Sequence, residues 1–234
     1  MAQHHMPKLV TRGLSLYLDA ANRASYPGSG TTWRDLSGNN LGLSATLTNS
    51  PSYNTSNLGY FSFTNASSTW VNTNVTTTAL NPNADFTMNC WCYLDPSIVS
   101  TSQSIVYYGN FLAFSPNYHW VGIVYSTAAV SFRTFDGTET ITSYSIPSIG
   151  WYMLTAVRSS TSQLFYAQGS LSSSGTVRSP SISSSATLRL GGNQSLNSSD
   201  FYSGRISTFK TYNRALTAAE VLQNFNATRG RFRV

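Results

Sequence analysis

The acidic side chains are the first candidates for chemistry, because two carboxyl groups can together cleave a glycosidic bond. The pair must lie about 5–5.5 Å apart for retention, or about 6.5–9.5 Å apart for inversion. The 234-residue chain has only eight Asp and Glu residues, and its two glutamates are Glu139 and Glu220. The aspartates are isolated, and Asp136-Gly-Thr-Glu139 is typical of a hairpin turn. The three histidines are not clustered either, so we expect a protein that is not an enzyme.

Aromatic rings are the second candidates, since a sugar ring can stack on an exposed ring that is flanked by Asn or Asp. Aromatic residues make up 13% of the chain. The available platforms are Trp33, Trp70, Tyr118, Trp120 and Tyr202. The alternative role is packing, because a Trp in a strand usually belongs to a core.

The basic side chains gather at the C-terminus. The net charge is +6, and residues 205–234 hold six of the 14 Lys and Arg residues against one acidic residue. Binding to nucleic acid usually needs many basic residues on one face, and no nucleic-acid motif is present, so we do not expect nucleic acid as a partner. A solvated tail and docking to an acidic partner protein remain open, and we favour docking. The candidate partner-binding residues are Lys8, Arg12, Arg229, Arg231, Phe232 and Arg233.

The composition indicates which elements must position these residues. Only 9% of the residues are charged, against about 25% in average domains, so Ser, Thr and Asn must supply the polar surface. Thr, Tyr, Phe, Val and Trp favour strands, and Asn, Ser and Gly favour turns. The sequence predicts an all-β fold in one domain. No apolar run approaches the roughly 18 residues that span a bilayer, and residues 1–13 lack the features of a signal peptide, so we expect no membrane contact.

Short segments that alternate with period two support this class. Leu14, Leu16 and Leu18 share one face, and in Phe86–Leu94 both faces look covered, which is typical of an inner strand. Their spacing of about ten residues is typical of a sandwich. The Ser-rich stretch 170–185 is expected to be a long loop or an edge hairpin. Further candidate strands are 43–48, 59–64, 69–75, 103–108, 110–115, 119–126, 129–135, 139–146, 151–159, 162–168, 186–190 and 201–212.

One short helix is expected near residues 217–227. Thr217-Ala-Ala-Glu220 is a capping box, Val221, Leu222 and Phe225 form an apolar stripe, and Gly230 follows as a stop. We therefore divide the chain into an N-terminal arm (1–12), a sandwich domain (13–228) and a basic C-terminal tail (229–234). Both ends hold too little apolar surface to order themselves, and we expect them to be mobile.

Several motifs resemble, in their order along the chain, concanavalin A-like lectin/glucanase (laminin-G-like) domains. They are Leu16-Tyr-Leu-Asp-Ala20, Tyr26–Trp33, Asp35–Asn40, Phe86–Trp91, Trp151–Thr155, Leu188–Gly192, Phe201–Ile206 and Tyr212–Glu220. The resemblance covers about residues 13–226 and implies a jelly-roll sandwich of two antiparallel sheets, with the two ends of the chain close together. The ending Asn224–Phe232 is most similar to versions in structural proteins of tailed bacteriophages.

The resemblance bears on three kinds of site. Hydrolases of this superfamily carry paired carboxylates on one strand, and no such pattern is present here. Calcium, which laminin-G-like domains often bind, would use Asp35 with Asn39 and Asn40. One carboxylate makes a weak site for an ion that takes six to eight oxygens, so we favour an Asx turn at Asp35 and expect no cofactor.

The resemblance also sorts the aromatic residues. Trp33, Trp91 and Trp151 match core positions of the family. The candidate glycan-binding residues that remain are Trp70, Tyr118, Trp120 and Tyr202.

Two functional classes follow. The first is a virion structural protein, a capsid decoration or cement subunit or a tail accessory subunit, present in the virion and, during assembly, in the host cytoplasm. Its partners would be other virion proteins. The second is a carbohydrate-binding adhesin, such as a receptor-binding fibre tip, which would bind host-surface glycans. Because the chain shows no coiled coil, β-helix or collagen-like shaft, we favour the first.

Overall fold

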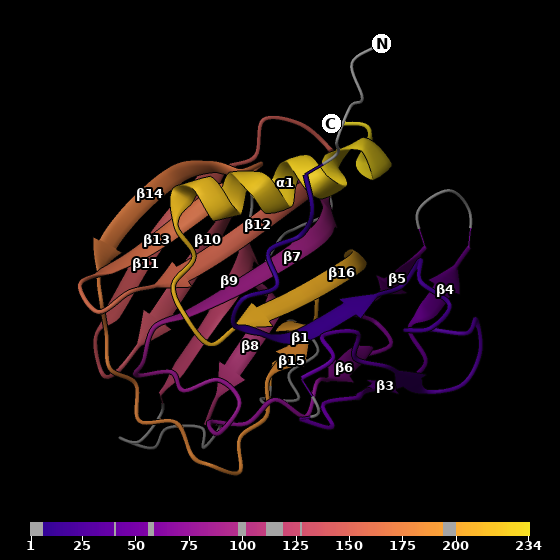
Figure 1. Ribbon diagram of the computed structural model, residues 1–234, viewed down its shortest axis with the longest axis horizontal. Coiled ribbons are helices and arrows are strands. Elements are labelled where there is room, and N and C mark those ends of the chain that lie inside the picture. Colours follow the sequence, from indigo (N-terminus) through magenta and orange to yellow (C-terminus); the bar gives the residue numbers. More distant parts are fainter. Residues whose placement is uncertain are drawn as a thin grey trace.

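Two antiparallel sheets of eight strands each form the body of the protein, with a helix at the C-terminal end (Figure 1). The computed structural model describes residues 7–39, 41–55, 59–97, 102–110, 119–126, 128–193 and 200–234. This architecture confirms the predicted all-β sandwich with one C-terminal helix. None of the helices in the described residues is long and apolar enough to span a membrane.

Sheet A contains the predicted inner strand at its centre. Its strands, in spatial order, are β14 (Ser170–Thr176), β13 (Ser162–Ala167), β12 (Gly150–Arg158), β7 (Phe86–Leu94), β16 (Gly204–Tyr212), β5 (Tyr60–Phe63) and β4 (Ser52–Asn54), with β1 (Leu14–Asp19) also paired to β16. β7 pairs with β12 on one edge and with β16 on the other. Both of its faces are covered, because Cys90 and Cys92 point into the core between the sheets and Trp91 points into a second core on the opposite face. Pairing of β13 with β14 confirms the edge-hairpin alternative for the start of the Ser-rich stretch.

Sheet B packs against sheet A and carries the other half of the core. Its strands, in spatial order, are β11 (Glu139–Ser145), β10 (Ala129–Phe135), β9 (Trp120–Ser126), β8 (Gln103–Gly109), β15 (Arg189–Leu190), β6 (Trp70–Asn72), β3 (Ala45–Thr48) and β2 (Thr32–Trp33). The short strands β2 and β4 were not predicted. Most of the predicted strand 110–115 lies outside the described residues.

The main core lies between the two sheets. Leu16 and Leu18 of β1 are fully buried there, as their period-two spacing predicts. Cys90 and Cys92 also face this core, are fully buried and are not joined in a disulfide, so they pack as small hydrophobes. Burial raises the pKa of the Cys92 thiol well above its usual value.

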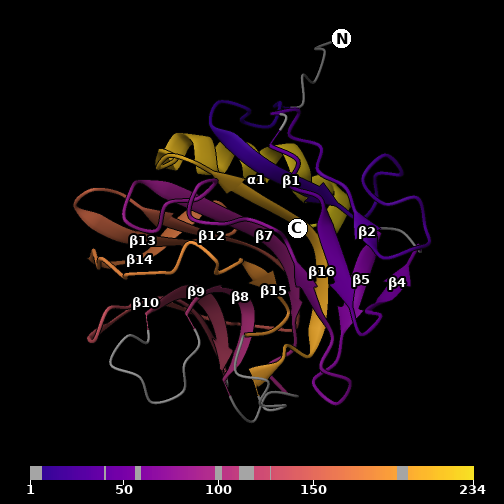
Figure 2. The ribbon, with the colours of Figure 1, turned by 90° about the horizontal axis from the view of Figure 1, so that it is seen from below.

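A second core lies on the outer face of sheet A, beneath helix α1 (Ala218–Phe232). Figures 1 and 2 show the helix lying across this sheet. The apolar residues that meet there are Val10, Trp91, Trp151, Met153, Val157, Tyr166, Tyr212, Leu216, Val221, Phe225 and Phe232. Trp91 is fully buried, as expected of a core residue, but it packs under the helix and not between the sheets.

The helix begins as predicted and ends later than predicted. The Thr217 side chain accepts a hydrogen bond from the Glu220 amide, and Glu220 accepts one from the Thr217 amide, which confirms the capping box. Gly230 does not stop the helix, which continues to Phe232 and ends with Arg233 in the left-handed conformation. Burial of the Phe232 ring offsets the roughly 1 kcal/mol that a helical glycine costs.

The N-terminal segment is tied to the helix, which contradicts the expectation of a mobile arm for residues 7–12. The Val10 amide donates to Asn224 Oδ1 (2.9 Å), and its carbonyl accepts from the Tyr212 hydroxyl (3.1 Å). The Gln223 side chain donates to the Lys8 carbonyl (2.7 Å). Pro7 and Val234 line the same hollow, so the two ends lie close together, as predicted.

Candidate functional site

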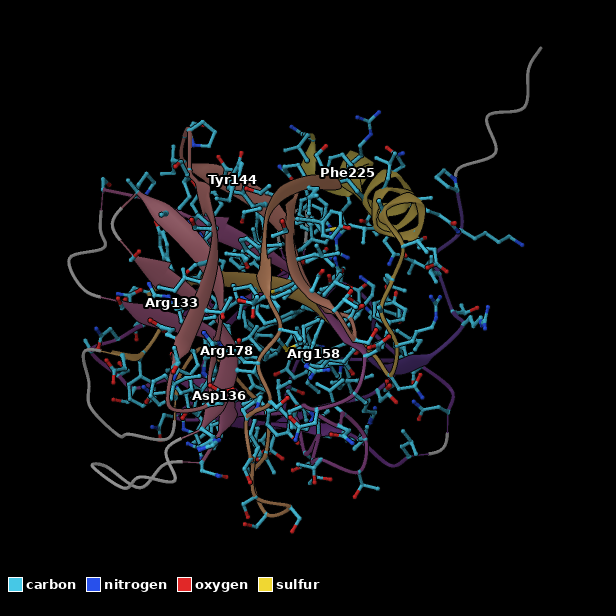
Figure 3. The ribbon with its side chains drawn as sticks, turned by 90° about the vertical axis from the view of Figure 1, so that its left-hand side faces the viewer. Arg133, Asp136, Tyr144, Arg158, Arg178 and Phe225 are labelled. Carbon is cyan, nitrogen blue, oxygen red and sulfur yellow. The ribbon has the colours of Figure 1, made fainter. Side chains whose placement is uncertain are left out.

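The outer face of sheet B is the open face of the sandwich. Helix α1 covers only the outer face of sheet A, and no helix of the described residues covers β8, β9 and β10 (Figure 2). In Figure 3, Arg133 lies on the strands of sheet B, while Phe225 lies beneath the helix on the other side of the molecule. On this face Trp120 and Arg133 are partly exposed and can meet a ligand, whereas Tyr107, Val124 and Ser131 are buried.

A pair of stacked rings lies on this open face. Tyr107 of β8 and Trp120 of β9 have ring centroids 5.9 Å apart and planes 19° from parallel. Their neighbour Gly122 pairs with both Tyr107 and Arg133 across the strands. A Cβ at position 122 would lie 3.5 Å from the Trp120 ring and would clash with the Val106 carbonyl. The close approach of the β8 backbone, and not the Trp120 ring, therefore requires glycine at this position.

Polar side chains surround this stack and form a shallow hollow of about 170 Å³. Its lining residues are Ser102, Ser104, Tyr107, Trp120, Val124, Arg133, Asn193 and Asp200. The Asn193 amide donates to Asp200 Oδ2 (2.9 Å), and Arg133 Nε donates to Ser131 Oγ (2.8 Å). The hollow is smaller than the roughly 300–1,000 Å³ of sites for drug-sized ligands, so it suits a single ring.

Trp70 lies further across the same sheet and is linked to this hollow through Arg189. The Arg189 guanidinium lies 4.1 Å from the Trp70 ring centroid, and its Nη1 donates to the Asn193 carbonyl (3.1 Å). Arg189 and Tyr107 are direct cross-strand partners. Burial lowers the pKa of Arg189 from its ordinary value, with a weaker opposing effect of Tyr107.

The structure separates the four residues predicted to bind glycans. Trp70 and Trp120 are partly exposed, and both belong to sheet B. Tyr202 is fully buried, and its hydroxyl donates to the Tyr93 carbonyl, so it offers no ring face to a ligand. Tyr118 lies outside the described residues. Trp33 is fully buried, as the family resemblance implies.

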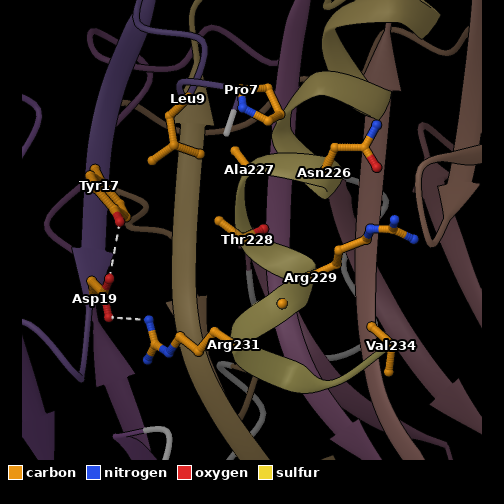
Figure 4. A pocket seen from close by; sticks show the side chains of 11 residues that line it. Pro7, Leu9, Tyr17, Asp19, Asn226, Ala227, Thr228, Arg229, Arg231 and Val234 are labelled. Carbon is orange, nitrogen blue, oxygen red and sulfur yellow. Dashed lines mark hydrogen bonds and ion pairs between the residues drawn. The ribbon is translucent and has the colours of Figure 1, made fainter. Parts of the chain in front are cut away.

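A larger hollow of about 970 Å³ lies between β1 and the end of helix α1 (Figure 4). Two of its charged groups, Asp19 and Arg231, are paired: Asp19 accepts from the Tyr17 hydroxyl (3.0 Å) and from Arg231 Nη1 (2.8 Å). Arg231 also donates to the Gly59 carbonyl (3.1 Å) and to Ser207 Oγ (2.6 Å). This cluster fastens the end of the helix to the sheet.

The predicted partner-binding residues divide accordingly. Arg231 is engaged within the fold and Phe232 is buried, so neither offers the partner contact that we expected. The remaining four are exposed, and their role in binding stays a prediction. They are Lys8, Arg12, Arg229 and Arg233.

Asp35 adopts the Asx turn that we favoured over a calcium site. Its Oδ1 accepts from the amides of Ser37 (2.9 Å) and Tyr17 (2.8 Å), and its Oδ2 accepts from the Ser37 hydroxyl (2.5 Å). The Asn39 side chain donates to the carbonyls of β1, and Asn40 lies outside the described residues. Within the described ranges, no group of three or more His, Cys, Asp or Glu side chains is placed to hold a metal ion.

Comparison with known proteins identifies the family. The family model Laminin_G_3, described as the concanavalin A-like lectin/glucanases superfamily, matches residues 65–222. Because this match covers more than half of the chain, the protein belongs to that family. No curated protein sequence matches the chain.

Solved structures with the same fold are only distantly related in sequence. The sialidase of Trypanosoma rangeli in complex with sialic acid has a TM-score of 0.66 at 16% identity. The binding domains of Paraclostridial Mosquitocidal Protein 1 and of botulinum neurotoxin serotype G each have a TM-score of 0.67, at 17% and 14% identity. These alignments cover 94%, 92% and 91% of this chain. They cover only 33%, 52% and 50% of those chains, so this protein spans a third of the sialidase and about half of each toxin domain.

These findings correct the interpretation of the chain as a virion structural protein, which is wrong. The structures that it resembles are sialidases and toxin binding domains, and none of those named above is a virion protein. The physical basis of that interpretation also changes, because much of the supposed free tail belongs to helix α1. The alternative, a carbohydrate-binding adhesin, stays a prediction.

Proposed function

We propose that this domain binds carbohydrate on the outer face of sheet B and does not hydrolyse it. The observation that carries the proposal is the Trp120–Tyr107 stack, which lies beside Arg133, Asn193 and Asp200 in one hollow. Two of the structures with this fold are themselves described as binding domains.

The chemistry of the hollow suits a pyranose ring. One face of such a ring carries C–H groups that pack on an aromatic side chain, while its rim of hydroxyls needs donors and acceptors. Trp120 supplies the aromatic surface. Arg133 supplies N–H donors, and Asp200 supplies carboxylate oxygens. Because Asn193 and Arg189 hold one another in place, the polar rim is pre-organised, which lowers the entropic cost of binding.

The state of the carboxylates supports binding without hydrolysis. Asp136 lies 3.9 Å from Arg178 and Glu139 lies 3.7 Å from Arg133, so each has a cationic neighbour at the hairpin. Glu220 is bonded to Arg214 at the start of the helix. We therefore expect no turnover of glycosides. Specific hydrolysis that is abolished by Asp136→Asn or Glu139→Gln would contradict this.

The test is a screen of the purified domain on immobilised glycans, followed by titration of any glycan that binds. We expect Trp120→Ala to weaken binding about tenfold or more, because both stacking and buried apolar area are lost. Trp120→Phe should retain much of the affinity. Ile141→Ala is the matched control, since this exposed residue belongs to the same sheet but does not line the hollow. If no glycan binds, or if Trp120→Ala binds as the unmodified domain does, the proposal fails.

A further inference from the structure

A second surface with binding chemistry lies on the opposite side of the molecule, on sheet A beside the C-terminal end of helix α1. Cross-strand pairing places Trp151, Tyr93, Arg205 and Ser62 in one row over β12, β7, β16 and β5. Tyr60 lies two residues before Ser62 on β5 and therefore shares its face. Tyr60, Tyr93 and Arg205 are all partly exposed.

Arg205 is held between two aromatic rings at the centre of this row. Its guanidinium carbon lies 4.5 Å from the Tyr93 ring centroid and 5.2 Å from that of Tyr60. Both tyrosines pack on Trp151, with centroid distances of 5.6 Å and 5.7 Å. Trp151 is in turn backed by Phe232 at 5.1 Å. The guanidinium therefore rests on rings that are themselves fixed by packing.

No counter-ion for Arg205 is found in the described part of the chain. The ion pairs there use Arg133, Arg178, Arg214 and Arg231. Arg205 makes ring contacts only, so its N–H groups are not committed to a carboxylate or carbonyl of the described residues. A guanidinium presents its donors as a planar fork that matches the two oxygens of a carboxylate or a sulfate.

From this geometry we infer that the Arg205 row is a second binding site, selective for an acidic saccharide. The oxyanion of the sugar, a uronate carboxylate or a sulfate ester, pairs with Arg205, and the sugar ring lies against the neighbouring tyrosines. This site does not depend on the sheet B hollow, because the two lie on opposite outer faces of the sandwich. An experiment can therefore disprove one site without disproving the other.

Three matched probes separate charge from ring contacts: methyl β-glucuronide, glucose 6-sulfate and the neutral methyl β-glucoside. Binding is followed by the indole N–H signals of Trp151 and Trp120 in NMR titrations, assigned through Trp→Phe variants. We expect one or both acidic probes to shift the Trp151 signal and the neutral probe to leave it unchanged. Which acidic probe binds more tightly identifies the source of the oxyanion.

Arg205→Gln should weaken the acidic probes by about tenfold or more, as expected for the loss of charge-assisted hydrogen bonds. Arg205→Lys keeps the charge but not the fork, so it should restore only part of the affinity. Trp120→Ala should leave the Trp151 response unchanged. An unchanged melting temperature shows that each variant is folded.

Four results would overturn the inference. The first is that Arg205→Gln binds the acidic probes as the unmodified domain does. The second is that the neutral probe shifts the Trp151 signal equally. The third is that inorganic sulfate binds as tightly as glucose 6-sulfate, in which case the sugar ring contributes nothing. The fourth is a response at Trp120 alone, which would exclude this site while supporting the sheet B site.

Discussion

Trp91 and Phe232 stack face to face, with ring centroids 3.9 Å apart and planes 14° from parallel. Trp91 is at the centre of β7, and Phe232 is the last residue of helix α1. The Trp91 Nε1 also donates to Thr228 Oγ1 at 2.8 Å, so the last turn of the helix is held by both stacking and a hydrogen bond.

Replacement of Trp91 by Ala should lower the free energy of unfolding by about 3–5 kcal/mol, because a large buried ring leaves a cavity. Urea unfolding of the purified domain measures this. Trp91→Phe is the control, since it keeps a ring against Phe232 and loses only the hydrogen bond, and it should cost clearly less. A loss below about 1 kcal/mol for Trp91→Ala would show that the helix does not depend on this contact.

Truncation should distinguish a docked helix end from a free tail. A chain that ends at Thr228 lacks both the Arg231–Asp19 pair and the Phe232 ring, and we expect a clear fall in melting temperature. A chain that ends at Phe232 lacks only exposed residues and should melt close to the full-length chain. Equal melting temperatures for the two truncated chains would contradict the docking of the helix end.

The general architecture could be predicted from local patterns, but the end of the helix could not. The alternation of side chains in Leu14–Asp19 and Phe86–Leu94 indicates that these segments are strands, and Thr217 with Glu220 indicates where a helix begins. Gly230 is a stop signal by local propensity. The contact of Phe232 with Trp91 overrides this signal. Because Trp91 is distant in the sequence, no pattern near Gly230 indicates the contact.

The candidate site could be predicted only in part, for a related reason. Trp70, Trp120 and Tyr202 are all aromatic residues near strands, and the sequence does not reveal that Tyr202 turns into the core. Tyr107 joins Trp120 only through the pairing of β8 with β9, and that register is a property of the folded sheet. For the same reason, the row of residues that contains Arg205 could not be predicted from the sequence.

Lys210 should make the stability depend on pH in the alkaline range. It is fully buried in β16, and burial lowers its pKa to about 8 against the opposing effect of Asp19. Between pH 8 and 10 the unfolded chain then binds more protons at this position than the folded chain, so Lys210 contributes a part of the free energy of unfolding that rises with pH. Urea unfolding at several pH values measures this part as a difference in slope, because the stability of Lys210→Met should rise less, or fall more steeply, than that of the unmodified domain.

The exposed Lys8 provides the matched control for that experiment. Lys8→Met should keep the slope of the unmodified domain. Equal slopes for Lys210→Met and the unmodified domain would mean that Lys210 is not the source. Burial raises the pKa values of Cys92 and of tyrosines such as Tyr17 and Tyr108, and these groups act in the opposite sense from about pH 9 upward. They are common to all three proteins, so the comparison of slopes isolates Lys210.

Glu220 should contribute stability that is lost in acid. Arg214 donates to both of its oxygens, at 2.8 Å and 2.6 Å, and this contact is the main cause of a pKa lowered to about 2. A carboxylate with a depressed pKa stabilises the fold above its unfolded pKa, and this contribution disappears as the pH falls from about 4.5 towards 2.

Glu220→Gln keeps a side-chain oxygen for the capping box but loses the charge that pairs with Arg214. It should therefore be less stable at pH 7, by about 1 kcal/mol or less, and should lose less stability on acidification. Thermal unfolding at pH 7, 4 and 2.5 measures both effects. Glu139→Gln, which removes a carboxylate 3.7 Å from Arg133 on the sheet surface, is the control and should change little. A parallel decline of Glu220→Gln and the unmodified domain would contradict the prediction.

The position of β16 has a consequence for synthesis on the ribosome. This strand is the last in the chain, yet it lies inside sheet A, paired with β7 on one edge and with β5 and β1 on the other. β1 pairs with no other strand of the described residues, so β1 stays unpaired until β16 has been synthesised. Until residues 204–212 emerge, the edges of β7 and β5 that pair with β16 stay unpaired, and sheet A cannot close. Contacts across such sequence separations fold slowly, and the waiting edges expose the nascent chain to aggregation.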